Sequence, residues 1–172
     1  PNSKCSWCTY KSPPVLKYAV SVQNEDVVAA LLEANNIDIN GYGDCLVSPL
    51  LDAVIKDNRI IVELLLHNAA SPDMQSGGYD RTPLVEAAMN DCKEICRLLL
   101  QYGASHDAID NKGMHSIYLA AQNNHREVIE LLMQYGADPQ QPSVQSKGSF
   151  SAARHARNKG HVELSNWLTT QR

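Results

Sequence analysis

The residue types best suited to chemistry in this chain are two cysteines near its start, Cys5 and Cys8, separated by Ser6 and Trp7. Two thiolates at this spacing can share one Zn²⁺ ion, which takes four ligands in a tetrahedron. A single pair supplies only half of such a site. Two interpretations stay open: half of a zinc site that is completed in a longer protein, or a head segment with two incidental thiols. A thioredoxin-like redox pair is a weaker interpretation, because no βαβ pattern follows.

The remaining cysteines do not extend this pair into a site. Cys92 and Cys96 are four residues apart, and Cys96 follows Ile95 in an apolar stripe, so we interpret it as a small buried hydrophobic residue. Five cysteines, an odd number at irregular spacing, argue against a disulfide framework. They favour a reducing compartment, so we predict a cytoplasmic location, with the nucleus as the alternative.

Sequence motifs for catalysis are missing. The six histidines form no pair at metal-binding spacing with a carboxylate, and the sequence has no glycine-rich phosphate loop, serine-nucleophile motif or His-Glu-x-x-His. We therefore predict no enzyme activity and no cofactor, apart from zinc at Cys5 and Cys8 in a longer protein. Because the chain begins at Pro1 rather than at a methionine, we expect it to be part of something longer.

The elements that carry these residues recur along the chain. Ser48-Pro-Leu-Leu-Asp-Ala returns as Thr82-Pro-Leu-Val-Glu-Ala-Ala and as His115-Ser-Ile-Tyr-Leu-Ala-Ala, with degenerate copies that start at Pro14 and Ser151. In each copy a small residue is followed eight positions later by an aliphatic one. These pairs are Ala19 and Val27, Ala53 and Ile61, Ala87 and Ile95, Ala120 and Val128, and Ala156 and Leu164. A period near 34 residues is typical of a stacked repeat protein.

Each repeat predicts two helices. The first begins at Ser-Pro or Thr-Pro, where the hydroxyl can cap the helix and proline loses no needed hydrogen bond. The second has an amphipathic apolar stripe, as at 98–100, and ends at Gly103 or Gly136, where glycine can adopt the left-handed conformation. A single unit cannot bury its stripe, so the core must lie between neighbouring units.

These motifs resemble the ankyrin repeat over about residues 13–172, most closely in TPLVEAAMNDCKEICRLLLQYGASHDAIDNKGM, which begins at Thr82. The resemblance implies an all-α solenoid of stacked helix-turn-helix units with projecting β-hairpin loops. We divide the chain into a head, 1–13, units at 14–47, 48–81, 82–114 and 115–150, and a cap at 151–172. The family histidine after Thr-Pro-Leu is replaced by Leu51, Val85 and Tyr118, so its hydrogen bonds must be replaced or lost. We expect Trp167 in the cap to cover the end of the core.

Charge excludes some classes of partner. The formal net charge is −4 and the isoelectric point is near 5.8, whereas nucleic-acid binding needs clustered cations. Residues 1–146 carry 10 Lys and Arg against 18 Asp and Glu, whereas residues 147–172 carry five against one. The longest apolar run, 27–32, is far shorter than the roughly 20 residues of a spanning helix. We predict a monomeric module that binds neither nucleic acid nor membrane.

By resemblance, the positions free for binding are the hairpin tips and the outer side of each first helix, which line a concave groove. In the three middle units these positions hold Tyr42, Asp44, Val47, Asp52, Ile55, Lys56, Asp57, Tyr79, Asp80, Arg81, Glu86, Met89, Asn90, Asp91, Asp110, Asn111, Lys112, Met114, Leu119, Gln122 and Asn123. In the cap they hold His155, Asn158 and Lys159.

This set predicts a partner. Tyr42 and Tyr79 are rigid amphipathic anchors of the kind found at interface hot spots, and Met89 and Met114 are adaptable apolar contacts. Around them the set places acidic side chains, namely Asp44, Asp52, Asp57, Asp80, Glu86 and Asp91. We predict an acidic groove that binds an extended basic and apolar segment across units two to four. The alternative is that these acids are ordinary solvated charges.

Asn40 is a candidate modification site. It lies eight residues after Leu32, which is similar to the setting in which ankyrin-repeat asparagines are hydroxylated by the asparaginyl hydroxylase. The equivalent positions hold Met74, Ala108 and Gln140. The alternative is that Asn40 forms a hydrogen bond within its hairpin.

The function predicted from the sequence is a non-catalytic protein-protein interaction module that serves as a scaffold or adaptor. The alternative is a substrate-recruiting or regulatory part of an enzyme complex such as a ubiquitin ligase or a kinase.

Overall fold

A computed structural model describes residues 15–34, 37–41, 46–142 and 150–171. These residues form ten α-helices. In chain order they are α1 (Val15–Ser21), α2 (Glu25–Leu32), α3 (Pro49–Ile55), α4 (Arg59–His67), α5 (Pro83–Met89), α6 (Lys93–Gln101), α7 (Ser116–Gln122), α8 (Arg126–Gln134), α9 (Ala152–Asn158) and α10 (Val162–Thr170). The predicted positions at Cys5, Cys8, Tyr42 and Asp44, and the head, lie outside the described residues.

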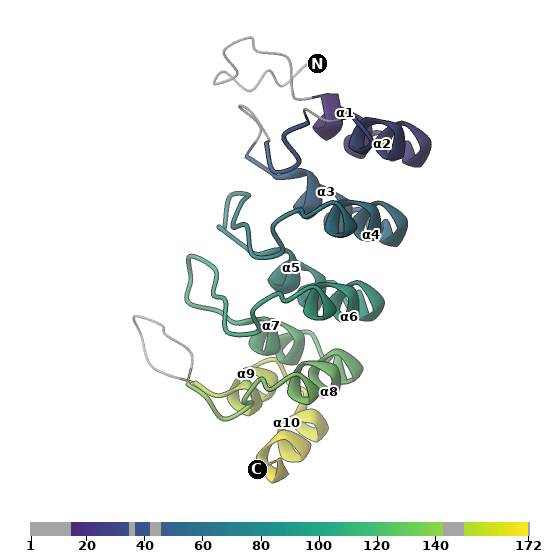
Figure 1. The fold of residues 1–172 in the computed structure, drawn as a ribbon. Helices are drawn as coiled ribbons and strands as arrows, with labels where there is room; N and C mark the ends of the chain where they lie inside the picture. Colours follow the sequence, from purple (N-terminus) through teal and green to yellow (C-terminus); the bar gives the residue numbers. More distant parts are fainter. Residues whose placement is uncertain (1–14, 35–36, 42–45, 143–149, 172) are drawn as a thin grey trace.

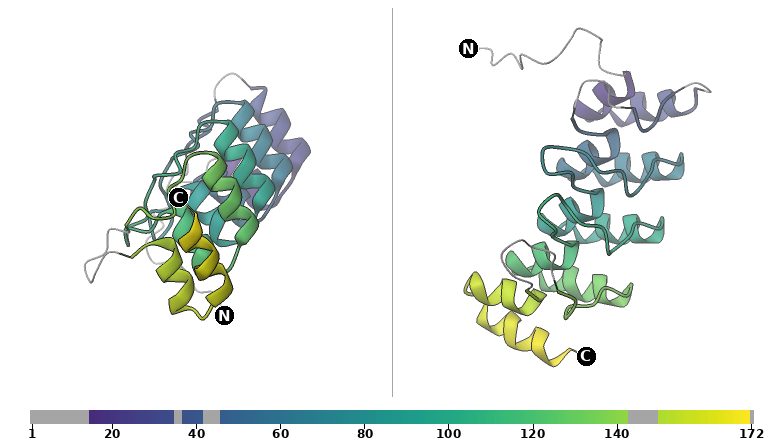
Figure 2. Two further views of the ribbon diagram at one scale, coloured as in Figure 1. Left: turned by 90° about the horizontal axis from the view of Figure 1, so that it is seen from below. Right: turned by 90° about the vertical axis from the view of Figure 1, so that its left-hand side faces the viewer.

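The helices stack as pairs along one axis, from α1 and α2 at one end to α9 and α10 at the other (Figure 1). The odd-numbered helices form one row, in which α1, α3, α5, α7 and α9 each contact the next. From α2 to α8, the even-numbered helices form a second row. The loops between units project from the side of the odd-numbered row, and a turned view shows the elongated shape (Figure 2). The predicted all-helical stack is confirmed.

The first helices begin where the sequence predicts. Ser48 and Thr82 accept hydrogen bonds from the N–H groups of Leu51 and Val85, at 3.2 and 3.4 Å. Pro49 and Pro83 occupy the first helical turn, where a missing N–H costs nothing. The later units depart from this pattern, because neither His115 nor Ser151 forms a side-chain cap hydrogen bond.

Left-handed residues follow the first helix of every unit and the second helices α4, α6 and α8. Gly103 and Gly136 follow the second helices with φ of 85° and 101°, as predicted, but Ala69 takes the same conformation in unit two with φ of 65°. The turn after each first helix uses one left-handed position throughout. It holds Gln23, Asp57, Asp91, Asn124 and Gly160. An alanine in this region costs roughly 1–2 kcal/mol relative to the right-handed region.

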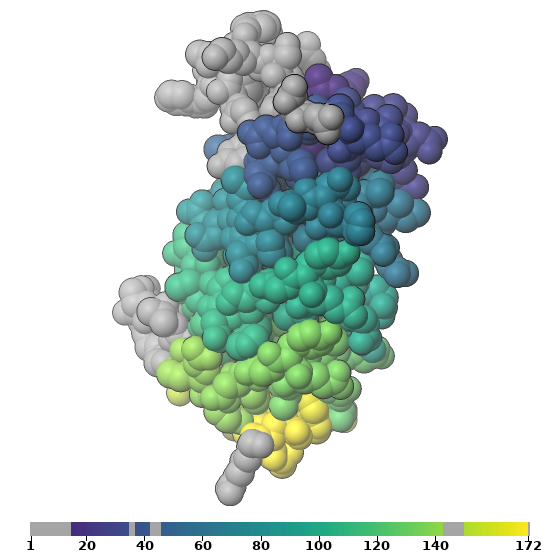
Figure 3. Space-filling model, in the orientation of Figure 1, coloured from purple at the N-terminus to yellow at the C-terminus, as the bar shows by residue number. Residues whose placement is uncertain are grey.

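The core lies between units, as predicted from the apolar stripes. The repeated small residues Ala53, Ala87 and Ala120 are at most 1 % exposed, and so are the aliphatic partners Ile61 and Ile95. Space-filling atoms of successive units form bands in close contact (Figure 3).

The two ends of the stack differ from its middle. Val27, at the position of Ile61 and Ile95, is 43 % exposed because no described unit precedes it. At the other end, Trp167 packs partly buried against the core, and the guanidinium of Arg126 lies 4.5 Å from its ring centroid. The side chain therefore covers part of the core end.

Side chains of the loops link each unit to the next. Gln75 donates a hydrogen bond to the carbonyl of Ile109 at 2.7 Å, and the backbone N–H of Ser105 donates to Asp73 at 2.9 Å. The loops contain isolated antiparallel bridges, such as Ser76 with Arg81.

The turns between the helices of a unit add a second set of links. His125 and His161 each place Nε2 3.0 Å from a backbone carbonyl of the preceding unit, those of Met89 and Gln122. The amide of Asn123 also donates to the Met89 carbonyl, at 3.0 Å. Both histidines therefore tie units together.

Candidate protein-binding surface

The odd-numbered helices present three repeated positions on the side of the projecting loops. The first holds Tyr18, Asp52, Glu86, Leu119 and His155; the second holds Ser21, Ile55, Met89, Gln122 and Asn158; the third holds Val22, Lys56, Asn90, Asn123 and Lys159. Tyr18, Val22 and Ile55 are 60 %, 53 % and 48 % exposed. Tyr18 and Val22 were absent from the predicted set, because unit one matches the repeat pattern weakly.

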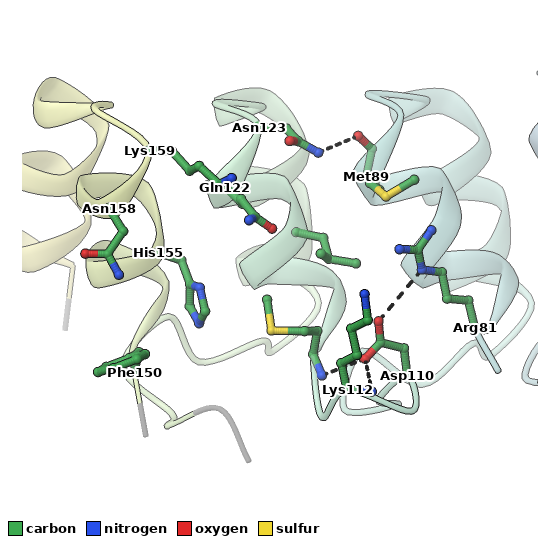
Figure 4. A pocket seen from close by; sticks show the side chains of 12 residues that line it. Arg81, Met89, Asp110, Lys112, Gln122, Asn123, Phe150, His155, Asn158 and Lys159 are labelled. Atoms are coloured by element: carbon green, nitrogen blue, oxygen red, sulfur yellow. Dashed lines mark hydrogen bonds and ion pairs between the residues drawn. The ribbon is translucent and has the colours of Figure 1, made fainter. Parts of the chain in front are cut away.

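A pocket of about 450 Å³ lies over α5, α7 and α9, and we name it the α5–α9 pocket (Figure 4). The helices and their ends contribute Met89, Leu119, Gln122, Asn123, His155, Asn158 and Lys159. The loops contribute Arg81, Asp110, Lys112, Met114 and Phe150. All of these except Phe150 were predicted as free surface positions. Phe150 was missed because it lies in the irregular connection before α9, where positions cannot be aligned with those of the other units.

The floor of this pocket is less accessible than predicted. Met114 and Leu119 line it but are only 5 % and 6 % exposed, so they belong mainly to the core. The prediction that both are free surface contacts is therefore wrong. Their side chains pack against the neighbouring units, and only a small part of each faces the pocket. Met89 is half-buried and remains the more adaptable apolar contact.

Arg81 organises the loop side of the pocket. Its Nη1 donates to Oε2 of Glu86 at 2.8 Å, and its Nε lies 3.8 Å from Oδ2 of Asp110. Asp110 is buried, and its Oδ1 accepts the backbone N–H groups of Lys112 and Met114 at 2.9 and 3.0 Å. This carboxylate therefore shapes the loop, and it also offsets the charge of Arg81.

Tyr79 lies between two cations on the same loops. The guanidinium of Arg81 is 4.8 Å and the ammonium of Lys112 is 4.3 Å from its ring centroid. The ring is 48 % exposed, and its backbone carbonyl accepts the N–H of Asn111 at 3.0 Å. These cation–π contacts restrict the position of the ring. The exposed part of Tyr79 therefore offers an apolar surface whose position is restricted.

The structure corrects the extent of the predicted acidic lining. Asp52 pairs with Lys17 at 2.5 Å, and Glu86 pairs with Arg81. Asp91 lies 3.5 Å from Nδ1 of His125. Asp57 and Asp80 are exposed. The other predicted positions, Val47, Lys56, Asn90, Asn111 and Asn123, are partly or fully exposed.

His155, which lines the pocket, belongs to a cluster of buried aromatic rings between α7 and α9. Tyr118 stacks on His155 with centroids 5.3 Å apart, and His115 meets Tyr118 edge-on at 5.1 Å. Burial lowers the pKa of both histidines below the ordinary value, and burial raises the pKa of Tyr118 to about 12. The Tyr118 hydroxyl donates to the carbonyl of Gln141. All three rings are therefore uncharged near neutral pH.

The two described cysteines have unreactive surroundings. Cys96 is buried as predicted, and Cys92 is half-buried; burial raises the pKa of both thiols, that of Cys92 to about 12. Among the residues that the structure describes, no three His, Cys, Asp or Glu side chains could hold a metal ion together. The zinc interpretation of Cys5 and Cys8 stays a prediction, since both lie outside the described residues.

Asn40 joins its own loop to the loop of the next unit. Its Oδ1 accepts the backbone N–H of Ser71 at 2.9 Å, and its own N–H donates to Asp38 at 3.2 Å. The side-chain bond therefore joins two units rather than lying within the hairpin of Asn40, as the alternative had it. Hydroxylation of Asn40 stays a prediction.

Comparison with known proteins identifies the family. No curated protein matches the chain. None of the described helices has the length and apolar character needed to span a bilayer. The family model described as ankyrin repeats (3 copies) matches residues 50–143, which is more than half of the sequence. Together with the stacked helix pairs, this match shows that the chain belongs to the ankyrin repeat family.

Proposed function

We propose that this chain is a non-catalytic scaffold or adaptor module that binds an extended segment of another protein along the odd-numbered helices. Ankyrin repeats are generally protein-protein interaction modules, and the α5–α9 pocket is the observation that carries the proposal here. The framework positions of each unit are used in packing, whereas most residues that line the pocket occupy positions whose residue type differs from unit to unit. Variable side chains on a rigid stack can determine which partner binds.

The surface over α1 and α3 supports an apolar part of that segment. Tyr18, Val22 and Ile55 are each about half exposed or more, and they occupy the same repeat positions as pocket residues further along the stack. Exposed apolar side chains that are contiguous on a soluble protein commonly mark interaction sites. The exposed carboxylate of Asp57, in the turn after α3, supports a basic residue in the same part of the segment. For the surface over α1 and α3, we therefore keep the proposal of a basic and apolar partner segment.

Two isoleucines provide a matched test. Ile55 on α3 is 48 % exposed on the proposed binding side, and Ile60 on α4 is 54 % exposed on the second row of helices. Glutamate suits both places, because Ile55 aligns with Gln122 and Asn158 and Ile60 aligns with Glu94 and Glu127. Affinity capture from cells with quantitative mass spectrometry should show at least a tenfold loss of partners for Ile55→Glu, since binding energy concentrates in few apolar contacts. Ile60→Glu should retain them.

The outcome against the proposal is equally clear. Equal recovery with both variants would show that the odd-numbered helices are not the binding surface. The same captures distinguish the two classes of role predicted from the sequence, because a ubiquitin ligase or kinase subunit among the lost partners would favour the enzyme-complex alternative. The cytoplasmic or nuclear location and the monomeric state remain predictions that cell fractionation and light scattering check.

A further inference from the structure

The cationic side chains of the α5–α9 pocket are unequally compensated. Three cations, Arg81, Lys112 and Lys159, line it together with one carboxylate, Asp110. Arg81 pairs with Glu86 and faces Asp110, so its charge is met within the protein. Lys112 and Lys159 are exposed, and no ion pair between described side chains includes either of them.

The sequence around the pocket adds to this imbalance. No Asp or Glu occurs between Asp138 and Glu163, whereas Lys147, Arg154 and Arg157 as well as Lys159 lie in that interval. The stretch of sequence around Lys159 therefore supplies no carboxylate to balance that lysine. Charges of one sign that line a concave surface raise the local concentration of groups of the opposite sign.

The rest of the lining suits a peptide rather than an isolated ion. Met89 offers a half-buried thioether, and Phe150, toward the opposite end of the pocket, offers a half-buried ring (Figure 4). Gln122 and Asn158 add amide groups to the lining. Amide side chains can bond the backbone of an extended segment, and adaptable apolar groups can receive one of its side chains. A volume of about 450 Å³ lies within the range of sites that enclose a small ligand.

We propose that the α5–α9 pocket binds an acidic residue of the partner segment, with its carboxylate between Lys112 and Lys159 and with separate apolar side chains of the segment against Met89 and Phe150. This inference rests on the proposed function and adds a direction to it. The basic and apolar part of the segment lies over α1 and α3, and the acidic part lies at the α9 end. The partner is thus a segment of mixed charge that can bind in one orientation only.

Synthetic peptides test this chemistry directly. Three peptides of equal length and leucine content carry Glu, Gln or Lys at the remaining positions, and each is titrated into the ¹⁵N-labelled chain to about 2 mM, which detects weak binding. The Glu peptide should shift the amide signals of Lys112, Leu119 and Asn158, and it should bind about tenfold more tightly than the Gln peptide. The Lys peptide should leave these signals in place. Raising the salt concentration should weaken binding of the Glu peptide.

Charge-reversal variants assign the effect to the pocket. Lys112→Glu combined with Lys159→Glu should weaken binding of the Glu peptide about tenfold or more. A control with the same change in net charge combines Arg59→Glu on α4 with Arg97→Glu on α6. It places glutamate where the aligned positions of other units hold Glu25 and Glu63. This control should leave the affinity within about twofold, because screening separates it from the pocket.

The results separate this inference from the proposed function. If the Glu peptide binds no better than the Gln peptide, or if the pocket variant and the control lose affinity equally, the acidic-partner inference is overturned. The capture experiment with Ile55→Glu and Ile60→Glu stands independently of both results, because it needs no assumption about the charge of the partner. Circular dichroism of each variant confirms that the stack remains folded.

Discussion

The ammonium group of Lys17 lies 2.5 Å from a carboxylate oxygen of Asp52, which joins α1 to α3 through an ion pair between two largely buried side chains. Lys17 takes the repeat position that holds Leu51, Val85 and Tyr118 in later units, so a charge replaces an apolar side chain here. Only a partner from the next unit makes this charge tolerable.

We predict that Lys17→Leu and Asp52→Leu each lower the free energy of unfolding by about 1–3 kcal/mol, because each leaves a partly buried charge without its partner. The double variant should cost at least about 1 kcal/mol less than the sum of the two, since Leu is already found at both repeat positions, as Leu51 and Leu119. Urea denaturation followed by circular dichroism measures all three. Strict additivity would show that the two groups do not interact.

Ala69 and Gly103 occupy equivalent positions after α4 and α6, with φ of 65° and 85°. Ala69→Gly should stabilise the chain by about 0.5–1 kcal/mol, because relief of the left-handed strain outweighs the added freedom of the unfolded glycine. Gly103→Ala should destabilise by a similar amount, and a Cβ there meets no atom within 4 Å, so only the backbone contributes. The midpoints of thermal and urea unfolding should therefore rise for Ala69→Gly and fall for Gly103→Ala. A shift of both midpoints in the same direction would contradict the assignment of strain to this left-handed position.

His115 and His155 make stability depend on pH. Burial holds the pKa of both below the ordinary value, so the unfolded chain binds protons that the folded chain does not as the pH falls through about 6.5. The nearby Asp107 partly opposes this effect at His115. We expect full stability above about pH 7.5 and a progressive loss between about pH 7 and 5.

The variant His155→Phe should reduce this acid sensitivity while it keeps a ring against Tyr118. The midpoints of urea unfolding at neutral and at mildly acidic pH measure how much stability each variant loses on acidification. His67→Gln, at an exposed position on α4, serves as the control and should keep the sensitivity. An unchanged slope in His155→Phe would exclude this histidine as its source.

Cys92 should be a slow nucleophile. Burial first, and then a hydrogen bond with the Asp57 side chain and the charges of Asp57, Asp91 and Glu86, together raise its pKa to about 12. Alkylation by iodoacetamide near pH 8 should be about a thousandfold slower than for the same cysteine in the unfolded chain, because the thiolate is the reactive form. Peptide mapping follows each cysteine separately, and Cys96 should react only on unfolding.

Asp57→Asn should accelerate alkylation of Cys92, since it removes one of the charges that disfavour the thiolate. Asp26→Asn, at an exposed acid on α2, is the matched control. Equal rates in the two variants would assign the slow reaction to burial alone.

Local sequence signals predicted the elements well. The caps at Ser48 and Thr82 and the left-handed Gly103 and Gly136 follow from residue type and neighbours a few positions away, and the structure confirms them. Ala69 shows the limit of this reasoning, because packing of unit two imposes the same conformation on a residue that disfavours it.

The binding surface was harder to predict, because it depends on contacts between units. The resemblance placed most residues of the α5–α9 pocket, but it could not show that Met114 and Leu119 are buried by their neighbours. Nor could it show that Asp52 and Glu86 are paired with Lys17 and Arg81. A list of acidic residues in one chain therefore overstates the negative charge that a partner would meet.

Helices in this stack contact their own partner and the adjacent units, and the ends α1 and α10 are held together only through everything between them. In such an architecture the terminal helix pairs can unfold while the central units remain folded. A partner segment bound from α1 to α9 would contact units at both ends of the stack, which do not contact each other. The partner itself would then supply the long-range coupling, so that binding should make the stack stiffer and its melting more nearly all-or-none.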